Sequence, residues 1–168
     1  MNAGDHAERF VDPGDTIYSL MAEEVLVTCP RCGNCATHKP NEAAKDNRDW
    51  FAPRRLICTH CTLVRDWAER SIYRNWRETP ARDDYFNEIL WLRGDCGSNE
   101  IWAYNWRHLD LVEKYVAATH RQHVRDSETG WANSSFVNRL PRWITSAKNR
   151  EDVLRAINRI RRSKAANK

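Results

Sequence analysis

Two Cys-x-x-Cys pairs, Cys29-Pro30-Arg31-Cys32 and Cys58-Thr59-His60-Cys61, lie 25 residues apart and decide how the first part of the chain folds. Each pair presents two sulfur atoms from one tight turn, and two such turns can supply the four thiolates of a tetrahedral zinc site. Gly33 follows the first pair and can adopt the positive φ that such a turn often needs. The pattern predicts one structural Zn²⁺ with the ligands Cys29, Cys32, Cys58 and Cys61.

Strand-forming residues flank both turns: Val-Leu-Val at residues 25–27, Arg-Leu-Ile at 55–57 and Leu-Val at 63–64. We therefore expect two short antiparallel hairpins, each with a metal-binding turn at its tip. Residues 39–48 connect the hairpins and contain Pro40, Asn41 and Asn47. This composition predicts an exposed loop.

These features make the segment similar to the zinc ribbon, a module of general transcription factors, RNA polymerase subunits, primases and many small bacterial proteins. The resemblance covers about a quarter of the chain and is carried by Cys29, Cys32, Gly33, Cys58 and Cys61. Thr62 departs from the pattern, because a second glycine is usual at its position. The departure concerns the geometry of the second turn more than its ligands.

Other cysteines and histidines offer alternatives to this ligand set. His38 could replace one cysteine, and His60 could donate a hydrogen bond to a sulfur. Cys96 has no Cys-x-x-Cys mate, so we expect an unpaired thiol; the alternative is an auxiliary ligand acting with Cys35 or a histidine. A thioredoxin-like redox motif is the competing interpretation of either pair alone, but no βαβ pattern surrounds the pairs.

The remaining chain is predicted to form a further hairpin and two to three helices. The hairpin joins residues 89–92 to residues 101–104 through the turn formers at 93–99. We expect a helix capped by Asn105 at 106–124, a short helix at 134–140, and a last helix that begins after Asn149. His120 and His123 would lie three residues apart on the first of these helices and could form a metal pair, although surface histidines are commoner there.

The predicted fold class is therefore α+β: an N-terminal zinc ribbon of antiparallel hairpins, a further hairpin, and C-terminal helices. Residues 1–22 form a leader, loose up to Asp15 and then a short helix or strand. Residues 23–80 form the ribbon, and residues 81–168 form the hairpin and helical region, packed as one unit with it. The C-terminal half resembles a group of uncharacterised small bacterial zinc-ribbon proteins, through Trp-Ala-Tyr-Asn at 102–105 and Ser-Ala-Lys-Asn-Arg at 146–150. This resemblance implies an architecture and no activity.

Composition predicts a soluble, cytoplasmic protein. Charged residues make up 30% of the chain and mean hydropathy is -0.79. No apolar run approaches the roughly 18 residues of a membrane span, and the N-terminus lacks the order of a signal peptide. In a reducing compartment, paired Cys-x-x-Cys turns are metal ligands more often than disulfides.

Eight tryptophans are an unusually large number for a chain of 168 residues. We expect most of them to build the core, because a small sheet with few aliphatic side chains can pack on large flat ones. The alternative is an aromatic platform on which single-stranded bases stack. The eight are Trp50, Trp67, Trp76, Trp91, Trp102, Trp106, Trp131 and Trp143.

Positive charge is concentrated at the C-terminus. Residues 137–168 carry ten Lys or Arg against Glu151 and Asp152, which leaves the rest of the chain acidic because the total is only +4. Such asymmetry is typical of a chain that meets a polyanion, although a solvated helix face must also be charged. The candidate phosphate-binding residues are Arg150, Arg155, Arg159, Arg162 and Lys164.

The function predicted from these features is a structural-zinc module associated with nucleic acid, in transcription or replication. The alternative is a protein-interaction module, such as an adaptor, regulator or toxin-neutralising partner, without nucleic-acid contact. No catalytic motif is present and four thiolates leave no open metal position, so we expect no enzyme; an uncharacterised zinc-dependent activity is the remaining alternative. The sequence suggests no small-molecule substrate and no membrane partner.

Overall fold

The computed structural model describes residues 9–41, 51–68, 72, 79–122, 125–126, 130–131 and 135–165. The predicted α+β class is confirmed, with the antiparallel ribbon strands in the N-terminal half and the longer helices in the C-terminal half. The ribbon strands are β2 (Val25–Thr28), β3 (Cys35–Pro40), β4 (Arg54–Ile57) and β5 (Val64–Trp67). The second half contains β6 (Leu92–Cys96), β7 (Asn99–Ala103), α2 (Trp106–Ala117), α3 (Arg142–Thr145) and α4 (Arg150–Ala165).

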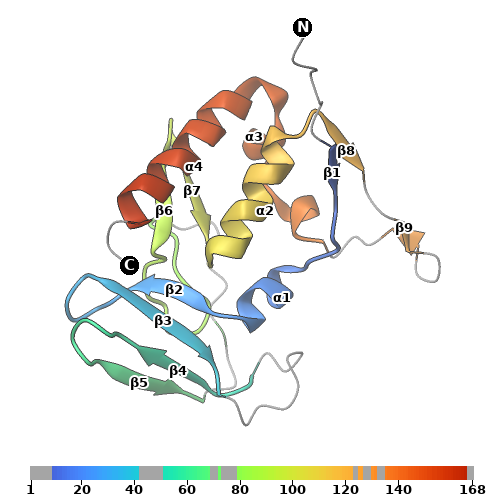
Figure 1. Cartoon of the computed structure of the whole chain (residues 1–168). Coiled ribbons are helices and arrows are strands. Elements are labelled where there is room, and N and C mark those ends of the chain that lie inside the picture. The colour runs from blue at the N-terminus through green and yellow to red at the C-terminus, as the bar shows by residue number, and fades with distance from the viewer. Residues whose placement is uncertain are drawn as a thin grey trace, which may run out of the picture.

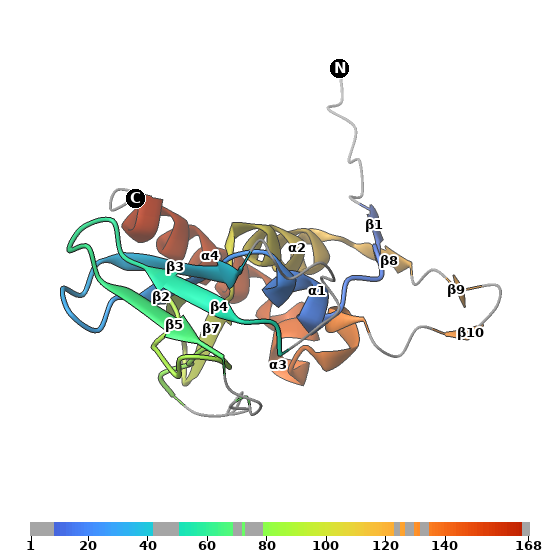
Figure 2. The same cartoon turned by 90° about the horizontal axis from the view of Figure 1, so that it is seen from below.

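The two expected hairpins around the cysteine turns are present and join into one sheet. The strand order is β2-β3-β4-β5, and every neighbouring pair is antiparallel, with Val27 opposite Ala36 and Ile57 opposite Val64. Figure 2 shows these four strands side by side. The predicted loop at 39–48 is wrong at its start, because Lys39 and Pro40 pair with β4; residues 42–50 lie outside the described residues.

The further hairpin is present, but its first strand begins at Leu92 and not at Ile89 as predicted, and its turn is shorter than expected. Strands β6 and β7 pair from Leu92 opposite Ala103 to Cys96 opposite Asn99, so residues 93–96 belong to a strand. Gly94 fits this strand for a packing reason: a Cβ atom there would lie 2.9 Å from Cγ1 of Ile160 in α4. Close approach of the last helix therefore explains a glycine that the sequence alone assigned to a turn.

Strand β2 connects the ribbon to the second half. The Leu26 amide donates to the Tyr104 carbonyl at 2.8 Å, and its carbonyl accepts from the Trp91 amide at 3.0 Å. Val27 also forms a bridge with Leu90. The hydrophobic core is continuous across this junction. The ribbon and the second hairpin thus share one interior.

Helices α2 and α4 pack on one another and cover the β6–β7 hairpin, as Figure 1 shows. Asn105 caps α2 as predicted, because its side chain accepts a hydrogen bond from the His108 amide at 2.8 Å. Helix α4 begins directly after Asn149, whose side-chain amide donates to the Trp143 carbonyl at 2.9 Å. The predicted short helix at 134–140 is the 3₁₀ turn η1 (Phe136–Arg139), and a second 3₁₀ turn, η2 (Ala147–Asn149), precedes α4.

The end of α2 and the start of the chain differ from expectation. Helix α2 ends at Ala117, and strand β8 (His120–Gln122) then pairs in parallel with β1 (Arg9–Val11). The prediction of a loose leader is therefore wrong from Arg9 onward, since Phe10 is buried edge-on against Tyr115. The expected short helix is present as α1 (Ile17–Ala22), capped by Thr16. Two further short strands, β9 (Arg125–Asp126) and β10 (Gly130–Trp131), pair with each other.

Tryptophan packing is confirmed in part. Trp67 and Trp91 are buried, whereas Trp102, Trp106 and Trp143 are partly buried against the core. The side chains of Trp50, Trp76 and Trp131 lie outside the described residues. Among the helices that the structure describes, none combines the length and apolar character needed to cross a membrane.

Candidate metal centre

The two cysteine turns have matching backbone geometry. In the first, the Gly33 amide donates to the Cys29 carbonyl at 2.9 Å, and the Cys29 amide donates to Asn34 at 2.7 Å. In the second, the Cys58 amide donates to Leu63 at 2.9 Å. The residue after each pair has positive φ, 75° at Gly33 and 56° at Thr62. Thr62 thus adopts the conformation that the missing glycine would supply.

The four predicted ligands come together at the tips of the hairpins. The sulfur atoms of Cys29, Cys32, Cys58 and Cys61 all lie within 4.8 Å of one another. Sγ of Cys29 is 3.6 Å from Sγ of Cys61, and the same distance separates Cys32 from Cys58. Four thiolates at about 2.3 Å from one tetrahedral ion would be roughly 3.8 Å apart. All six cysteines are free thiols, so the cluster is not a pair of disulfides.

The cluster has the electrostatics of a cation site. A hydrogen bond from the Asn34 backbone lowers the pKa of Cys32 to about 6, whereas partial burial raises the pKa of Cys61 to about 12. The Arg31 amide also donates to Sγ of Cys29 at 3.4 Å. Four neighbouring thiolates repel one another, and a bound divalent cation removes that penalty. The donor set therefore fits a metal ion that ionises all four thiols.

The alternative ligands lie apart from this cluster. Cys35 and Cys96 are not among the four grouped cysteines, and Cys96 is buried at the end of β6. His60 is exposed and, among the described residues, donates to none of the sulfurs. His120 lies in strand β8 and not on a helix, so the predicted helical His120–His123 pair is wrong in its geometry; His123 is outside the described residues.

His38 belongs to a second, fully buried cluster that sequence analysis missed. Its Nδ1 atom accepts from Nε of Arg54 at 3.0 Å, which leaves the proton of the neutral ring on Nε2. That atom lies 3.1 Å from Oδ1 of Asp83, at an angle outside good hydrogen-bond geometry. Strand alternation offered a signal, because His38 shares a face with buried Ala36, and Arg54 with buried Leu56.

Charges in this cluster are fixed by burial and by hydrogen bonds. Burial lowers the pKa of His38, so the ring is neutral. Burial alone would raise the pKa of Asp83, but His38 and the amides of Phe86 and Tyr85 offset it, and the pKa is lowered. Asp83 is therefore an anion held by backbone donors, and Arg54 is the neighbouring cation. The cluster links β3 and β4 to the segment that precedes β6.

The five predicted phosphate-binding residues have different surroundings. Arg150 donates to the Ala118 carbonyl at 3.2 Å, and Nζ of Lys164 lies 4.0 Å from the centre of the Trp91 ring. On the outer face of α4, Arg155 pairs with Asp152, and Arg159 donates to the Asp95 carbonyl at 2.8 Å. Arg162 is exposed, and the structure gives it no polar contact among the described residues. The structure brings Arg155 and Arg159 together beside one surface hollow.

No protein-family model, curated protein or solved structure matches this chain. The fold and the site define the class only: an α+β chain with a four-cysteine metal centre on a four-stranded ribbon. The resemblance of the C-terminal half to a group of small bacterial zinc-ribbon proteins stays a prediction.

Proposed function

We propose that this chain is a structural-zinc protein that associates with single-stranded nucleic acid through the surface between α4 and the β6–β7 turn. One observation carries the proposal: Arg155, Arg159 and the indole of Trp143 line a single hollow of about 420 Å³. Guanidinium groups can meet phosphates, and a partly exposed indole can stack on a base. Cation and aromatic ring together make the combination expected of a single-strand site.

The arginines of this hollow are held by weak, exposed contacts. Arg155 pairs with Asp152 and more loosely with Glu151 at 3.8 Å, and all three side chains are exposed. Exposed pairs of this kind contribute about 0–1 kcal/mol, so a phosphate can replace the carboxylates at little cost. Arg159 donates one hydrogen bond to the backbone carbonyl of Asp95 in β6. Its remaining guanidinium N–H groups can bind a ligand.

The proposed metal is zinc, and its proposed role is structural. Four thiolates satisfy the tetrahedral preference of Zn²⁺ and leave no position for a substrate or a water molecule. The ribbon strands have only four to six residues each. Such short hairpins need an anchor at the tip, and the ion supplies it. We therefore propose no catalytic role for the metal.

Fluorescence anisotropy with a labelled single-stranded oligonucleotide tests the nucleic-acid proposal. We expect affinity to fall steeply between 50 and 200 mM salt, and to fall at least tenfold in the double variant Arg155→Glu, Arg159→Glu. The matched control is Arg55→Glu, Arg65→Glu, which makes the same change of net charge on the ribbon. Equal losses in the two double variants would show that only net charge matters and would overturn the proposed surface.

A protein partner is the second candidate, because the ribbon exposes apolar side chains beside the metal centre. Ile57 and Val64 are paired across β4 and β5 and are 42% and 53% exposed. Affinity capture from cells, with and without nuclease, separates the two candidates. A stoichiometric protein that survives nuclease and is lost in Val64→Lys would favour this second function; loss of all captured material on nuclease treatment favours the first.

A further inference from the structure

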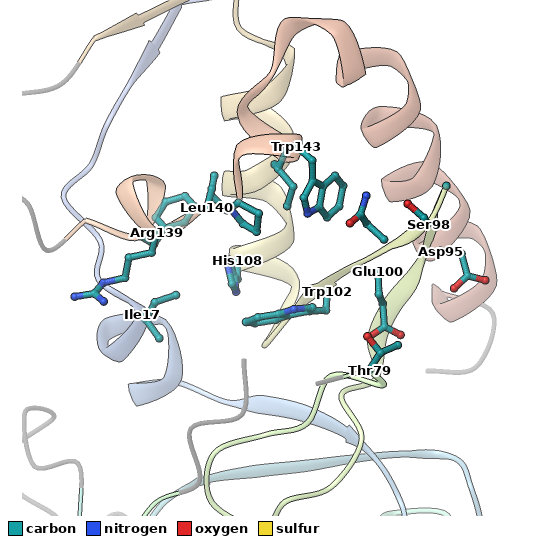
Figure 3. Close-up of a pocket in the computed structure, with 15 residues that line it drawn as sticks. Ile17, Thr79, Asp95, Ser98, Glu100, Trp102, His108, Arg139, Leu140 and Trp143 are labelled. Atoms are coloured by element: carbon teal, nitrogen blue, oxygen red, sulfur yellow. The ribbon is translucent and has the colours of Figure 1, made fainter. Parts of the chain in front are cut away.

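A cavity of about 500 Å³ lies between β7, η1 and α3, away from the metal centre. The volume falls within the range of roughly 300–1,000 Å³ that is typical of small-molecule sites. Figure 3 shows the side chains of Trp102, His108 and Trp143 around a common space. The rest of the wall is mixed: its apolar side chains include Ile17, Phe136 and Leu140, and its polar side chains include Asp95, Glu100 and Arg139.

His108 is a buried residue that contributes a polar ring atom to this cavity. The residue is only 3% exposed, and its Nδ1 atom accepts a hydrogen bond from the Tyr104 amide at 3.3 Å. The proton of the neutral ring is therefore on Nε2. Burial lowers the pKa of His108 to about 4, so this neutral form is the one present at pH 7. Within the part of the chain that the structure describes, Nε2 has no hydrogen-bond partner.

Neighbouring aromatic rings hold His108 in place. The Trp102 ring meets it edge-on at 6.0 Å between ring centres, and Phe136 does so at 5.6 Å. The indole N–H groups of Trp102 and Trp143 also lack an acceptor among the described residues. The aromatic part of the wall thus presents three ring N–H donors.

The carboxylate beside these donors is already occupied. Glu100 accepts from the Ala81 amide through Oε2 and from Arg93 through Oε1, both at 2.8 Å. Each carboxylate oxygen of Glu100 therefore already accepts one hydrogen bond. The other charged residues that the structure describes in the wall are one cation, Arg139, and one anion, Asp95, so their charges balance. A matching ligand therefore brings acceptors for the ring donors, flat surfaces for the indoles, and no net charge.

We propose that this cavity binds a planar, uncharged heterocycle whose carbonyl oxygen or ring nitrogen accepts a hydrogen bond from Nε2 of His108. Trp102 and Trp143 contact the ring faces or edges of the ligand. The same chemistry is offered by a free small molecule and by a base of a nucleic acid. Trp143 also lines the hollow of Arg155 and Arg159, so the two sites share this wall residue, whereas His108 and Trp102 line only the present cavity. The inference therefore rests on His108 and Trp102 and not on nucleic-acid binding at Arg155 and Arg159.

Quinolin-2-one, a flat bicycle with one carbonyl, is a suitable probe, and naphthalene is its match without an acceptor. We expect quinolin-2-one to bind the metal-loaded chain at least tenfold more tightly than naphthalene, by ligand-observed NMR. Binding should also shift the Nε2 resonance of His108 in the ¹⁵N spectrum. His108→Leu should weaken binding at least tenfold, whereas His108→Gln keeps a side-chain N–H donor and should retain more of it.

The matched tryptophan variants are Trp143→Leu, which alters the cavity wall, and Trp106→Leu, which alters a partly buried ring outside it. Only the first should weaken binding. If His108→Leu does not fold, two other measurements test the proposal. They are the Nε2 shift in the unmodified chain and the comparison of Trp143→Leu with Trp106→Leu. Equal binding of the two probes, an unmoved Nε2 resonance, or equal losses in the tryptophan variants would overturn the proposal.

A competition experiment identifies the source of the heterocycle. A ten-nucleotide single-stranded oligonucleotide that displaces quinolin-2-one and itself shifts the Nε2 resonance of His108 would support the cavity as a base-binding pocket. The second readout is needed because Trp143 lines both sites. An oligonucleotide that binds without displacing the probe would support a free small molecule as the ligand. Because the probe experiment stands alone, failure of the nucleic-acid proposal and failure of the cavity proposal remain distinguishable.

Discussion

Thr62 adopts the same left-handed backbone conformation as Gly33, with φ values of 56° and 75°. Each residue directly follows the second cysteine of its pair, so both turns close around the sulfur cluster in the same way. Only glycine occupies this region without steric cost; for other residues the cost is about 1–2 kcal/mol. The ribbon therefore carries strain in its second turn that its first turn avoids.

Replacement of Thr62 by glycine should stabilise the metal-loaded protein. Relief of the strain is partly offset by about 0.5–1 kcal/mol of added unfolded-state entropy, so we expect a net gain of about 0.5–1 kcal/mol. Gly33→Ala should cost about 1–2 kcal/mol for the converse reason. Denaturant unfolding measures both. Thr59→Gly, in the same turn without positive φ, is the control and should destabilise; an equal loss in Thr62→Gly would contradict the strain argument.

Loss of the metal should unfold the ribbon. Structural zinc supplies on the order of 10 kcal/mol of folding free energy, so a chelator, Cys29→Ser or Cys58→Ser should abolish the cooperative transition of residues 25–67. Elemental analysis should give one zinc per chain. Cys35→Ser and Cys96→Ser are controls that should keep the metal, because neither sulfur belongs to the cluster. A metal-free chain with unchanged thermal unfolding would refute the structural role.

The sequence predicted the ribbon well because its determinants are local. Cysteine spacing and flanking apolar runs specify the two turns and the two hairpins. The predictions of a loose leader up to Asp15 and of a helix that continues to residue 124 were wrong, because the β1–β8 pair joins segments more than 100 residues apart. Local strand and helix propensities cannot predict a contact between segments so far apart in the sequence.

Packing decided the other differences. Gly94 and Asp95 are turn formers by composition, yet they lie in β6 because α4 packs closely over that strand. The cavity at His108 could not be predicted from the sequence either, because its wall comes from four separate elements, β7, α2, η1 and α3. Periodicity predicted an amphipathic helix at residues 106–124, but it did not indicate that the histidine in the first turn of this helix faces a hollow.

The buried Asp83 should be more important for stability than an exposed aspartate in an ion pair. Asp83→Asn removes the anion that accepts from three backbone amides and faces His38, leaving Arg54 without its nearby charge. Breaking a buried charged cluster costs about 3–5 kcal/mol. Asp66→Asn breaks only the exposed pair with Arg55 and should cost less than about 1 kcal/mol. Similar losses by denaturant unfolding would argue against the buried cluster as a junction.

Gly94 and Ile160 should be energetically coupled. Gly94→Ala places a Cβ atom 2.9 Å from Cγ1 of Ile160, so we expect a loss of about 1–3 kcal/mol from overpacking. Ile160→Ala creates space but removes buried surface, at a cost of about 2–5 kcal/mol. In the double variant the new methyl group occupies part of that space. The double loss should be smaller than the sum of the single losses by at least 1 kcal/mol; strict additivity would exclude the contact.

Protonation of His108 should destabilise the fold in mild acid. Its pKa is lowered by burial to about 4 in the folded chain, against about 6.5 when unfolded. Between these values the unfolded state binds the proton and the folded state does not. The stability present above pH 6.5 is therefore lost as the pH falls to 4, by about 3 kcal/mol.

His108→Gln removes this titration, and comparison with the unmodified chain cancels the contributions of His38 and of metal release. The difference in unfolding free energy between the two proteins should change by about 3 kcal/mol between pH 7 and pH 4, in favour of the glutamine variant at low pH. His120→Gln, at an exposed position in β8, is the control for the histidine-to-glutamine substitution itself. Parallel stability curves for His108→Gln and the unmodified chain would show that His108 is not a buried neutral ring.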